Sequence, residues 1–148
     1  MAIWKKNTDL ARLNKLSENT IIAHLGIFYT QIGDDFLQAT MPVDARTHQP
    51  HGLLHGGASV VLAETLGSVA ANLTVSENKI CVGLEVNASH LRSAKQGIVT
   101  GIARPLRIGR TTQVWDIEIV NERAQLLCCS RLTVAVLDKP KQHLATDV

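Results

Sequence analysis

Glu64 is the only residue with a formal charge between Arg46 and Glu77, and it stands in a run of small and apolar residues. A carboxylate without a partner is costly in apolar surroundings, so this position requires either a partner or a chemical use. A carboxylate can act as a nucleophile or as a general base. Glu64 is therefore the first candidate for a catalytic residue.

A loop rich in glycine and histidine lies just before Glu64 in the chain. Its sequence, QPHGLLHGG, covers residues 49–57. Gly56 and Gly57 are expected to open a helix, where free backbone N–H groups and the helix dipole favour a developing negative charge. We therefore expect the N–H group of Gly56 to stabilise an oxyanion. About two helical turns separate Gly57 from Glu64, which places both on one face of the helix.

An apolar stripe predicts that residues 57–73 form this helix. Leu62, Leu66, Val69 and Leu73 recur at the spacing of a buried helix face. Because the segment carries a single charge, we expect the helix to be buried nearly all round.

The rest of the chain is predicted to form an antiparallel sheet and one short helix. A capped helical pattern covers residues 9–16, and a β-hairpin covers residues 27–32 and 36–41. Four strands follow the long helix, at residues 80–86, 97–108, 111–120 and 126–137. Short connections favour an antiparallel sheet, so we predict an α+β fold in which the sheet wraps around the one long helix. In this prediction, residues 1–138 form one domain and residues 139–148 form a flexible tail.

The composition of the 148-residue chain argues against several classes of protein. A formal net charge of +2 and few aromatic residues do not suit a protein that binds nucleic acid. No apolar run approaches the roughly 18 residues of a membrane span, and the N-terminus lacks the apolar core of a secretory signal. Three cysteines, an odd number, favour a reduced, cytoplasmic protein. The loop histidines lack nearby cysteine or aspartate, so neither a metal nor a cofactor is expected.

Four longer motifs extend the pattern around Glu64. With x for any residue, they are MPVDxRTxQP from Met41, LHGG from Leu54, LAETLGS from Leu62 and VGLEVNAxHxR from Val82. On these motifs the chain resembles the hotdog-fold acyl-CoA thioesterases. Within that family it is most similar to the bacterial branch that contains the 1,4-dihydroxy-2-naphthoyl-CoA thioesterase of menaquinone synthesis.

The resemblance implies a site that is shared between two subunits. Glu64 of one subunit would face Gln49, His55 and Gly56 of the other. There it would attack a thioester carbonyl or activate a water molecule, and Ser68 would hold that water. His55 and Gln49 would orient the thioester or the loop. The sequence does not separate the nucleophile route from the general-base route.

Cations near the strand ends suit the phosphates of CoA, because arginine presents paired donors to phosphate oxygens. Together with the resemblance, they predict CoA contacts at His90, Leu91, Arg92, Ser93, Arg107, Ile108, Gly109, Arg110, Thr111 and Thr112. Gly83 is expected to line the acyl end of the pocket, together with Leu53, Leu54 and Val69.

The resemblance also implies the substrate and the assembly. Aromatic acyl-CoA is expected to be preferred, with medium-chain acyl-CoA second. The sheets of two subunits would pair edge to edge, and the dimers would form a homo-oligomer, a dimer of dimers. An acyl carrier protein is a further partner that this branch allows.

Several alternatives stay open at this point. A proofreading thioesterase would act on an acylated carrier protein. A hotdog hydratase or dehydratase would need a second acidic residue near the loop, and a non-catalytic acyl-CoA sensor would need no carboxylate. Each candidate residue could also have a purely structural role. Glu64 could be paired with a donor in the loop, and Gly56 could serve only the tight entry of the loop into the helix. His55 and Ser68 could be packing residues, and the amide of Gln49 could only stabilise the loop.

Overall fold

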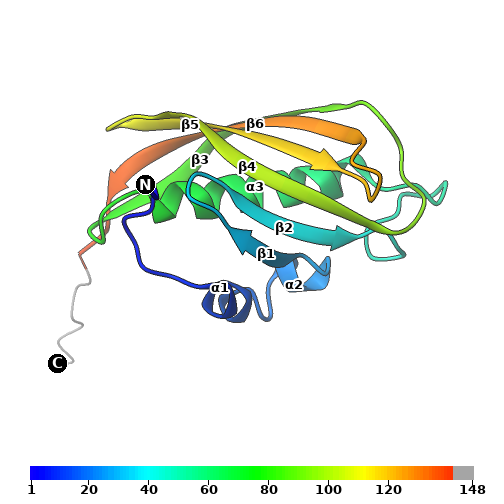
Figure 1. Ribbon diagram of the computed structural model, residues 1–148, viewed down its shortest axis with the longest axis horizontal. Helices are drawn as coiled ribbons and strands as arrows, with labels where there is room; N and C mark the ends of the chain where they lie inside the picture. The colour runs from blue at the N-terminus through cyan, green and yellow to red at the C-terminus, as the bar shows by residue number, and fades with distance from the viewer. Residues whose placement is uncertain (142–148) are drawn as a thin grey trace, which may run out of the picture.

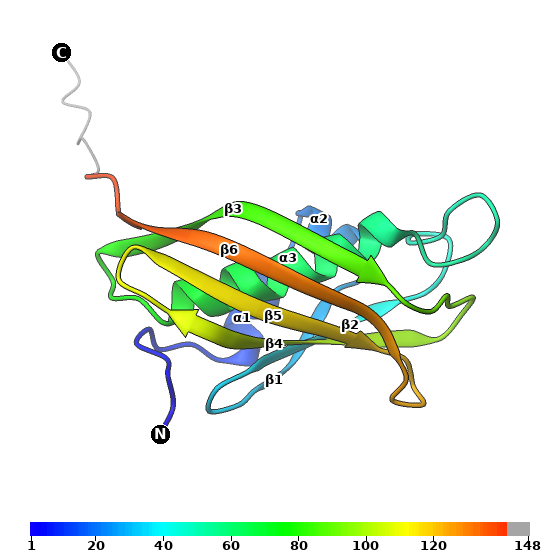
Figure 2. The ribbon, with the colours of Figure 1, turned by 90° about the horizontal axis from the view of Figure 1, so that it is seen from above.

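A six-stranded antiparallel sheet curves around one long helix in the computed structural model, which describes residues 1–141 (Figure 1). The predicted α+β architecture is confirmed. The strands lie in the order β1-β2-β4-β5-β6-β3, so β1 and β3 are the two edges (Figure 2). The elements are α1 (Leu10–Leu16), α2 (Ile21–His24), β1 (Phe28–Ile32), β2 (Leu37–Pro42), α3 (Gly56–Leu73), β3 (Lys79–His90), β4 (Ile98–Ile108), β5 (Thr112–Val120) and β6 (Leu126–Asp138).

The elements follow the predicted ones closely, with two differences. Strand β3 continues to His90, beyond the predicted end at Val86, because β6 pairs with it along its whole length as far as Cys128. The one-turn helix α2 was not predicted, since four residues are too few to show a helical period. The predicted tail, residues 139–148, falls mainly on residues 142–148, which lie outside the described residues.

One side of α3 forms the core against the concave face of the sheet. Leu62 and Leu66 are fully buried there, and burial of each leucine side chain contributes about 1.5–3 kcal/mol. The helix approaches the sheet closely, since a Cβ atom at Gly101 would lie 2.7 Å from Leu66 Cδ1. A Cβ atom at Gly67 would lie equally close to Leu132 Cδ2. Glycine at both positions therefore permits this packing.

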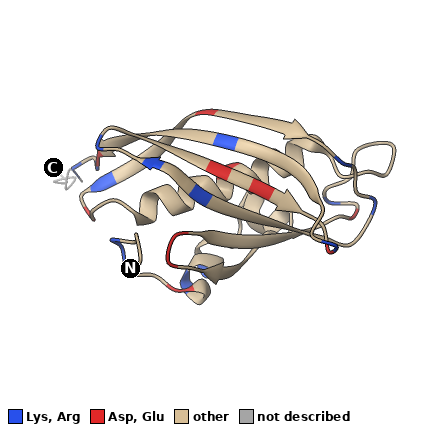
Figure 3. Ribbon diagram, turned by 45° about the horizontal axis from the view of Figure 1, so that its top comes forward, with Lys and Arg blue, Asp and Glu red and all other residues tan. Residues whose placement is uncertain are grey.

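The other face of the sheet carries charged side chains. Along the strands, exposed charged side chains such as Arg104, Glu118 and Arg131 alternate with buried apolar ones such as Ile117 and Leu132. Figure 3 shows that positions of both signs of charge are spread over the strands. This period of two is expected when only one face of a sheet packs on the core. No helix within residues 1–141 combines the length and the apolar character that crossing a membrane requires.

The prediction that α3 is buried nearly all round is wrong for one face. Glu64 is exposed, and Thr65, Ser68 and Val69 are only partly buried. The sheet covers just one side of α3, and α2 provides little cover on the other. The carboxylate of Glu64 is therefore open to solvent in the single protomer.

Candidate functional site

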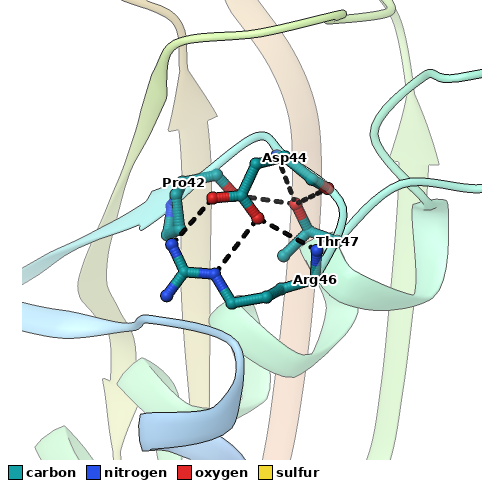
Figure 4. Close-up of polar contacts among 4 residues, drawn as sticks. All are labelled: Pro42, Asp44, Arg46 and Thr47. Carbon is teal, nitrogen blue, oxygen red and sulfur yellow. Dashed lines mark hydrogen bonds and ion pairs between the residues drawn. The ribbon is translucent and has the colours of Figure 1, made fainter.

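A compact polar turn holds the start of the loop that leads into α3 (Figure 4). The Arg46 side chain donates two hydrogen bonds to Asp44, from Nη2 at 2.7 Å and from Nε at 3.1 Å, and its backbone N–H donates a third at 3.0 Å. The hydroxyl of Thr47 donates to the carbonyl of Pro42 at 2.7 Å. The Arg46 side chain lowers the pKa of Asp44 to about 2, with a further contribution from the Arg46 N–H. The turn thereby fixes the direction in which the chain leaves β2.

Gln49 has its backbone and its amide oxygen engaged within the same loop. Its N–H donates to the carbonyl of Leu53 at 2.8 Å, and its Oε1 accepts the N–H of His51. The Nε2 group of Gln49 donates to no atom among residues 1–141. Gln49 therefore presents a free N–H donor from a loop whose geometry is fixed.

His55 caps the N-terminus of α3. Its Nδ1 atom accepts the N–H of Gly57 at 2.8 Å, and its carbonyl accepts the N–H groups of Ala58 and Ser59. The N–H of Gly56 has no acceptor in the described part of the chain. Since the positive end of the helix dipole lies at the same place, Gly56 offers a free donor to a negatively charged oxygen.

The end of β3 lies against this helix start. A Cβ atom at Gly56 would be 2.8 Å from Nε2 of His90, so the imidazole ring lies directly beside the glycine backbone. A cavity of about 400 Å³ opens here. Among its lining residues are Gln49, Gly56, His90, Leu91, Arg92 and Ser93. The structure thus brings six of the predicted site residues together in one place.

Glu64 lies elsewhere on α3. It is eight residues beyond Gly56, which corresponds to about 12 Å along the helix axis. It lines a separate cavity together with Ser68 and Val69. Gly83 lies beneath its carboxylate, since a Cβ atom at Gly83 would be 3.1 Å from Glu64 Oε1. Within residues 1–141, the Glu64 side chain makes no hydrogen bond or ion pair.

The two predicted groups of CoA contacts lie at opposite ends of the sheet. His90 pairs with Cys128 at one end of β6, whereas Thr112 pairs with Ala135 near the other end. The turn of residues 107–112 therefore lies beside Lys79, where β3 begins (Figure 2). One protomer does not bring this turn to the cavity that contains Arg92. The predicted apolar lining is divided as well: Leu53 and Leu54 line the Gly56 cavity, and Val69 lines the Glu64 cavity.

Sequence reasoning missed two residues that line the Glu64 cavity. Ile21 and Ile22, both from α2, form part of its wall. The only available signal was Thr20, whose hydroxyl caps the helix by accepting the N–H of Ile22. A cap followed by a single turn gives no periodic pattern, so the pair could not be placed from the sequence.

Comparisons with known proteins decide the family. The family model described as Thioesterase superfamily matches residues 51–128. This chain belongs to that superfamily. The thioesterase is 60% identical to the putative esterase VC_A0580 of Vibrio cholerae over 92% of this chain and 91% of the relative. It is 54% identical to the 1,4-dihydroxy-2-naphthoyl-CoA hydrolase of Escherichia coli, over 91% of this chain and 99% of that protein.

Two further relatives agree. The proofreading thioesterase EntH of Cronobacter sakazakii is 54% identical over 91% of this chain and 98% of its own length. The crystal structure of thioesterase HI1161 from Haemophilus influenzae superposes with a TM-score of 0.92 at 49% identity, covering 95% of this chain and 99% of that one. The predicted hotdog fold and the predicted class, a thioester hydrolase, are confirmed. The hydratase and the non-catalytic sensor gain no support from these relatives.

Proposed function

We propose that this thioesterase hydrolyses acyl-CoA, with aromatic acyl groups preferred and medium-chain acyl groups second. The observation that carries the proposal is the free N–H group of Gly56 beside a cavity that also contains Gln49 and Arg92. A relative at 54% identity is a hydrolase of 1,4-dihydroxy-2-naphthoyl-CoA by name, which supports an aryl-CoA substrate.

The separation of Glu64 from Gly56 supports a site that two protomers share. Strand β3 is an edge of the sheet and carries exposed Val82 and Leu84. Edge strands present unpaired backbone groups that readily pair with a second chain. In a two-fold dimer the two β3 strands would run antiparallel, so the Lys79 end of one would meet the His90 end of the other.

This antiparallel pairing would also join the divided cationic groups. The turn of residues 107–112 lies at the Lys79 end of β3, and Arg92 lies just beyond His90. Pairing would therefore bring Arg110 of one protomer toward Arg92 of its partner. Both could then contact the phosphates of one CoA molecule. A dimer of such dimers is the assembly that we propose for the complete protein.

We propose the following chemistry for these groups. The thioester carbonyl oxygen would accept the N–H of Gly56, and Gln49 would orient the thioester. The partner subunit's Glu64 would then take a proton from a water molecule, which Ser68 of the same subunit as that Glu64 would hold. The resulting hydroxide attacks the carbonyl carbon, the C–S bond breaks, and the CoA thiolate leaves with the proton from Glu64. In the alternative route, Glu64 attacks the carbonyl directly, and water hydrolyses the mixed anhydride that results.

An acylated carrier protein is a second candidate substrate. The relative EntH is a proofreading thioesterase by name, and it matches this chain at 54% identity. Coenzyme A and carrier proteins present the acyl group on the same phosphopantetheine arm, so one catalytic site can serve both.

The three cysteines, Cys81, Cys128 and Cys129, are free. Free cysteines favour a reducing compartment, and we propose the cytoplasm.

A thiol-release assay tests the proposed function. Benzoyl-CoA, decanoyl-CoA and a benzoylated carrier protein are incubated with the protein and a thiol-detecting dye. We expect release of free thiol from benzoyl-CoA to be fastest. We expect Glu64→Gln to slow it by on the order of 10²–10⁴ without unfolding the protein. Release of no thiol by the parental protein would refute the proposed activity. Full activity in Glu64→Gln would refute the proposed role of Glu64.

A further inference from the structure

The cavity beside Glu64 has an apolar wall that the catalytic scheme does not use. It has a volume of about 400 Å³. Val61 and Val69 of α3 form one side, and Ile21 and Ile22 of α2 form the other. Glu64 therefore lies at the edge of an apolar slot, distinct from the polar cavity beside Gly56.

The helix α2 is held firmly in place even though it has a single turn. Asn19 and Gly26, which flank it, both have positive φ angles, of 61° and 70°. The N–H of Ile27 returns to the carbonyl of Ile22 at 3.0 Å and closes the turn. A Cβ atom at Gly26 would lie 2.7 Å from Arg46 Nη1, so α2 ends directly against the loop that leads to Gln49.

The two isoleucines of α2 differ in their surroundings. Ile22 is partly buried and packs against the core, so it anchors the helix. Ile21 is 57% exposed, although it is a large apolar side chain in the wall of a cavity. An apolar group that entered the slot would cover Ile21 and remove apolar surface from water.

We propose that α2 forms the distal wall of the acyl pocket, and that Ile21 sets the size of the acyl group that the enzyme accepts. The inference rests on the proposed function, because the acyl group enters the slot when its carbonyl carbon is held at Glu64. The ligand class is an apolar acyl group, either a straight chain or a ring. A large side chain at position 21 shortens the slot and a small one lengthens it.

The test uses two variants that change Ile21 in opposite directions. Ile21→Ala enlarges the slot and keeps a residue with high helix propensity. Ile21→Trp fills it. Leu16→Ala on α1 is the matched control, since Leu16 is 69% exposed and lies outside the cavity lining. The measured quantity is kcat/KM for butanoyl-, octanoyl-, decanoyl- and benzoyl-CoA, and sedimentation checks that each variant keeps the parental assembly.

We expect opposite shifts in acyl preference. Ile21→Trp should lower kcat/KM for decanoyl-CoA and benzoyl-CoA relative to butanoyl-CoA by about tenfold. Ile21→Ala should move the optimum toward longer chains, and Leu16→Ala should reproduce the parental profile. An unchanged profile in both Ile21 variants would overturn the inference while the proposed function stands. Loss of the parental assembly in Ile21→Trp would assign Ile21 to a subunit interface and also overturn it. A parental protein that releases no thiol refutes the proposed function itself.

Discussion

The Nδ1 atom of His55 accepts the N–H of Gly57 at 2.8 Å, and among residues 1–141 this bond leaves the N–H of Gly56 as the free donor at the start of α3. An imidazole that accepts through Nδ1 is neutral and carries its proton on Nε2. His55 is therefore an N-cap that fixes the geometry of the helix start. His55 can therefore affect the reaction by holding the backbone at Gly56 and Gly57, as well as by orienting the thioester directly.

This capping role predicts that asparagine can replace His55. Loss of the cap in His55→Ala should cost about 1 kcal/mol of folding free energy and lower kcat, because the helix start loosens. In His55→Asn, the side-chain oxygen can accept the same N–H group, so both stability and kcat should recover in large part. Urea unfolding and steady-state kinetics check the two effects. Equal loss of kcat in both variants would show that the imidazole itself is required.

The contact between Gly83 and Glu64 predicts a second effect. A methyl group at Gly83 would lie 3.1 Å from Glu64 Oε1, so Gly83→Ala should displace the carboxylate by a few tenths of an ångström. We expect kcat to fall by up to about 10²-fold, because small misplacement of a reacting group is costly. Folding stability and KM for acyl-CoA should change little. Leu16→Ala, at an exposed position of α1 outside the proposed β3 interface, is the control. Parental kcat in Gly83→Ala would contradict the placement of Glu64.

The two cationic groups should act on the same part of the substrate. Arg92→Ala and Arg110→Ala are each expected to raise KM for acyl-CoA by about tenfold, because a charged hydrogen bond to phosphate is lost. Neither should affect a short acyl-pantetheine thioester, which lacks the nucleotide. Arg131→Ala, an exposed arginine on the outer face of the sheet, is the control. If Arg92→Ala raises KM for acyl-CoA and Arg110→Ala does not, residues 107–112 lie outside the CoA site.

The pair of Asp44 and Arg46 predicts a pH dependence of stability. Arg46 lowers the pKa of Asp44 from 3.8 to about 2 in the folded protein. The ionised carboxylate therefore contributes stability above about pH 4, and this contribution is lost as the pH falls through about 2. Asp44→Asn should accordingly be less stable than the parental protein at neutral pH, and the difference should shrink as the pH falls through this window. Urea unfolding across that range measures it, with Glu18→Gln as an exposed control. A difference that stays constant with pH would contradict the assignment.

Local pattern was enough to predict the secondary structure around the site, and it supplied the residues proposed to react. The apolar stripe on α3, the glycine pair before it and the isolated charge of Glu64 are all readable over a few residues of sequence. The exposure of Glu64 was not readable, because it depends on which side of α3 the sheet covers. The separation of Arg92 from Arg110 was not readable either, since it follows from the strand order of the whole sheet.

Subunit complementation tests the shared site most directly. Glu64→Gln removes the carboxylate, and Gly56→Val places a side chain over the free N–H group. Each variant alone should be nearly inactive toward benzoyl-CoA. In a dimer that contains one of each, Gly56 of the first chain still meets the partner subunit's Glu64, so one of the two sites is intact. Co-expression in equal amounts should therefore restore about a quarter of the parental activity. A co-expressed mixture no more active than the single variants would contradict the shared site.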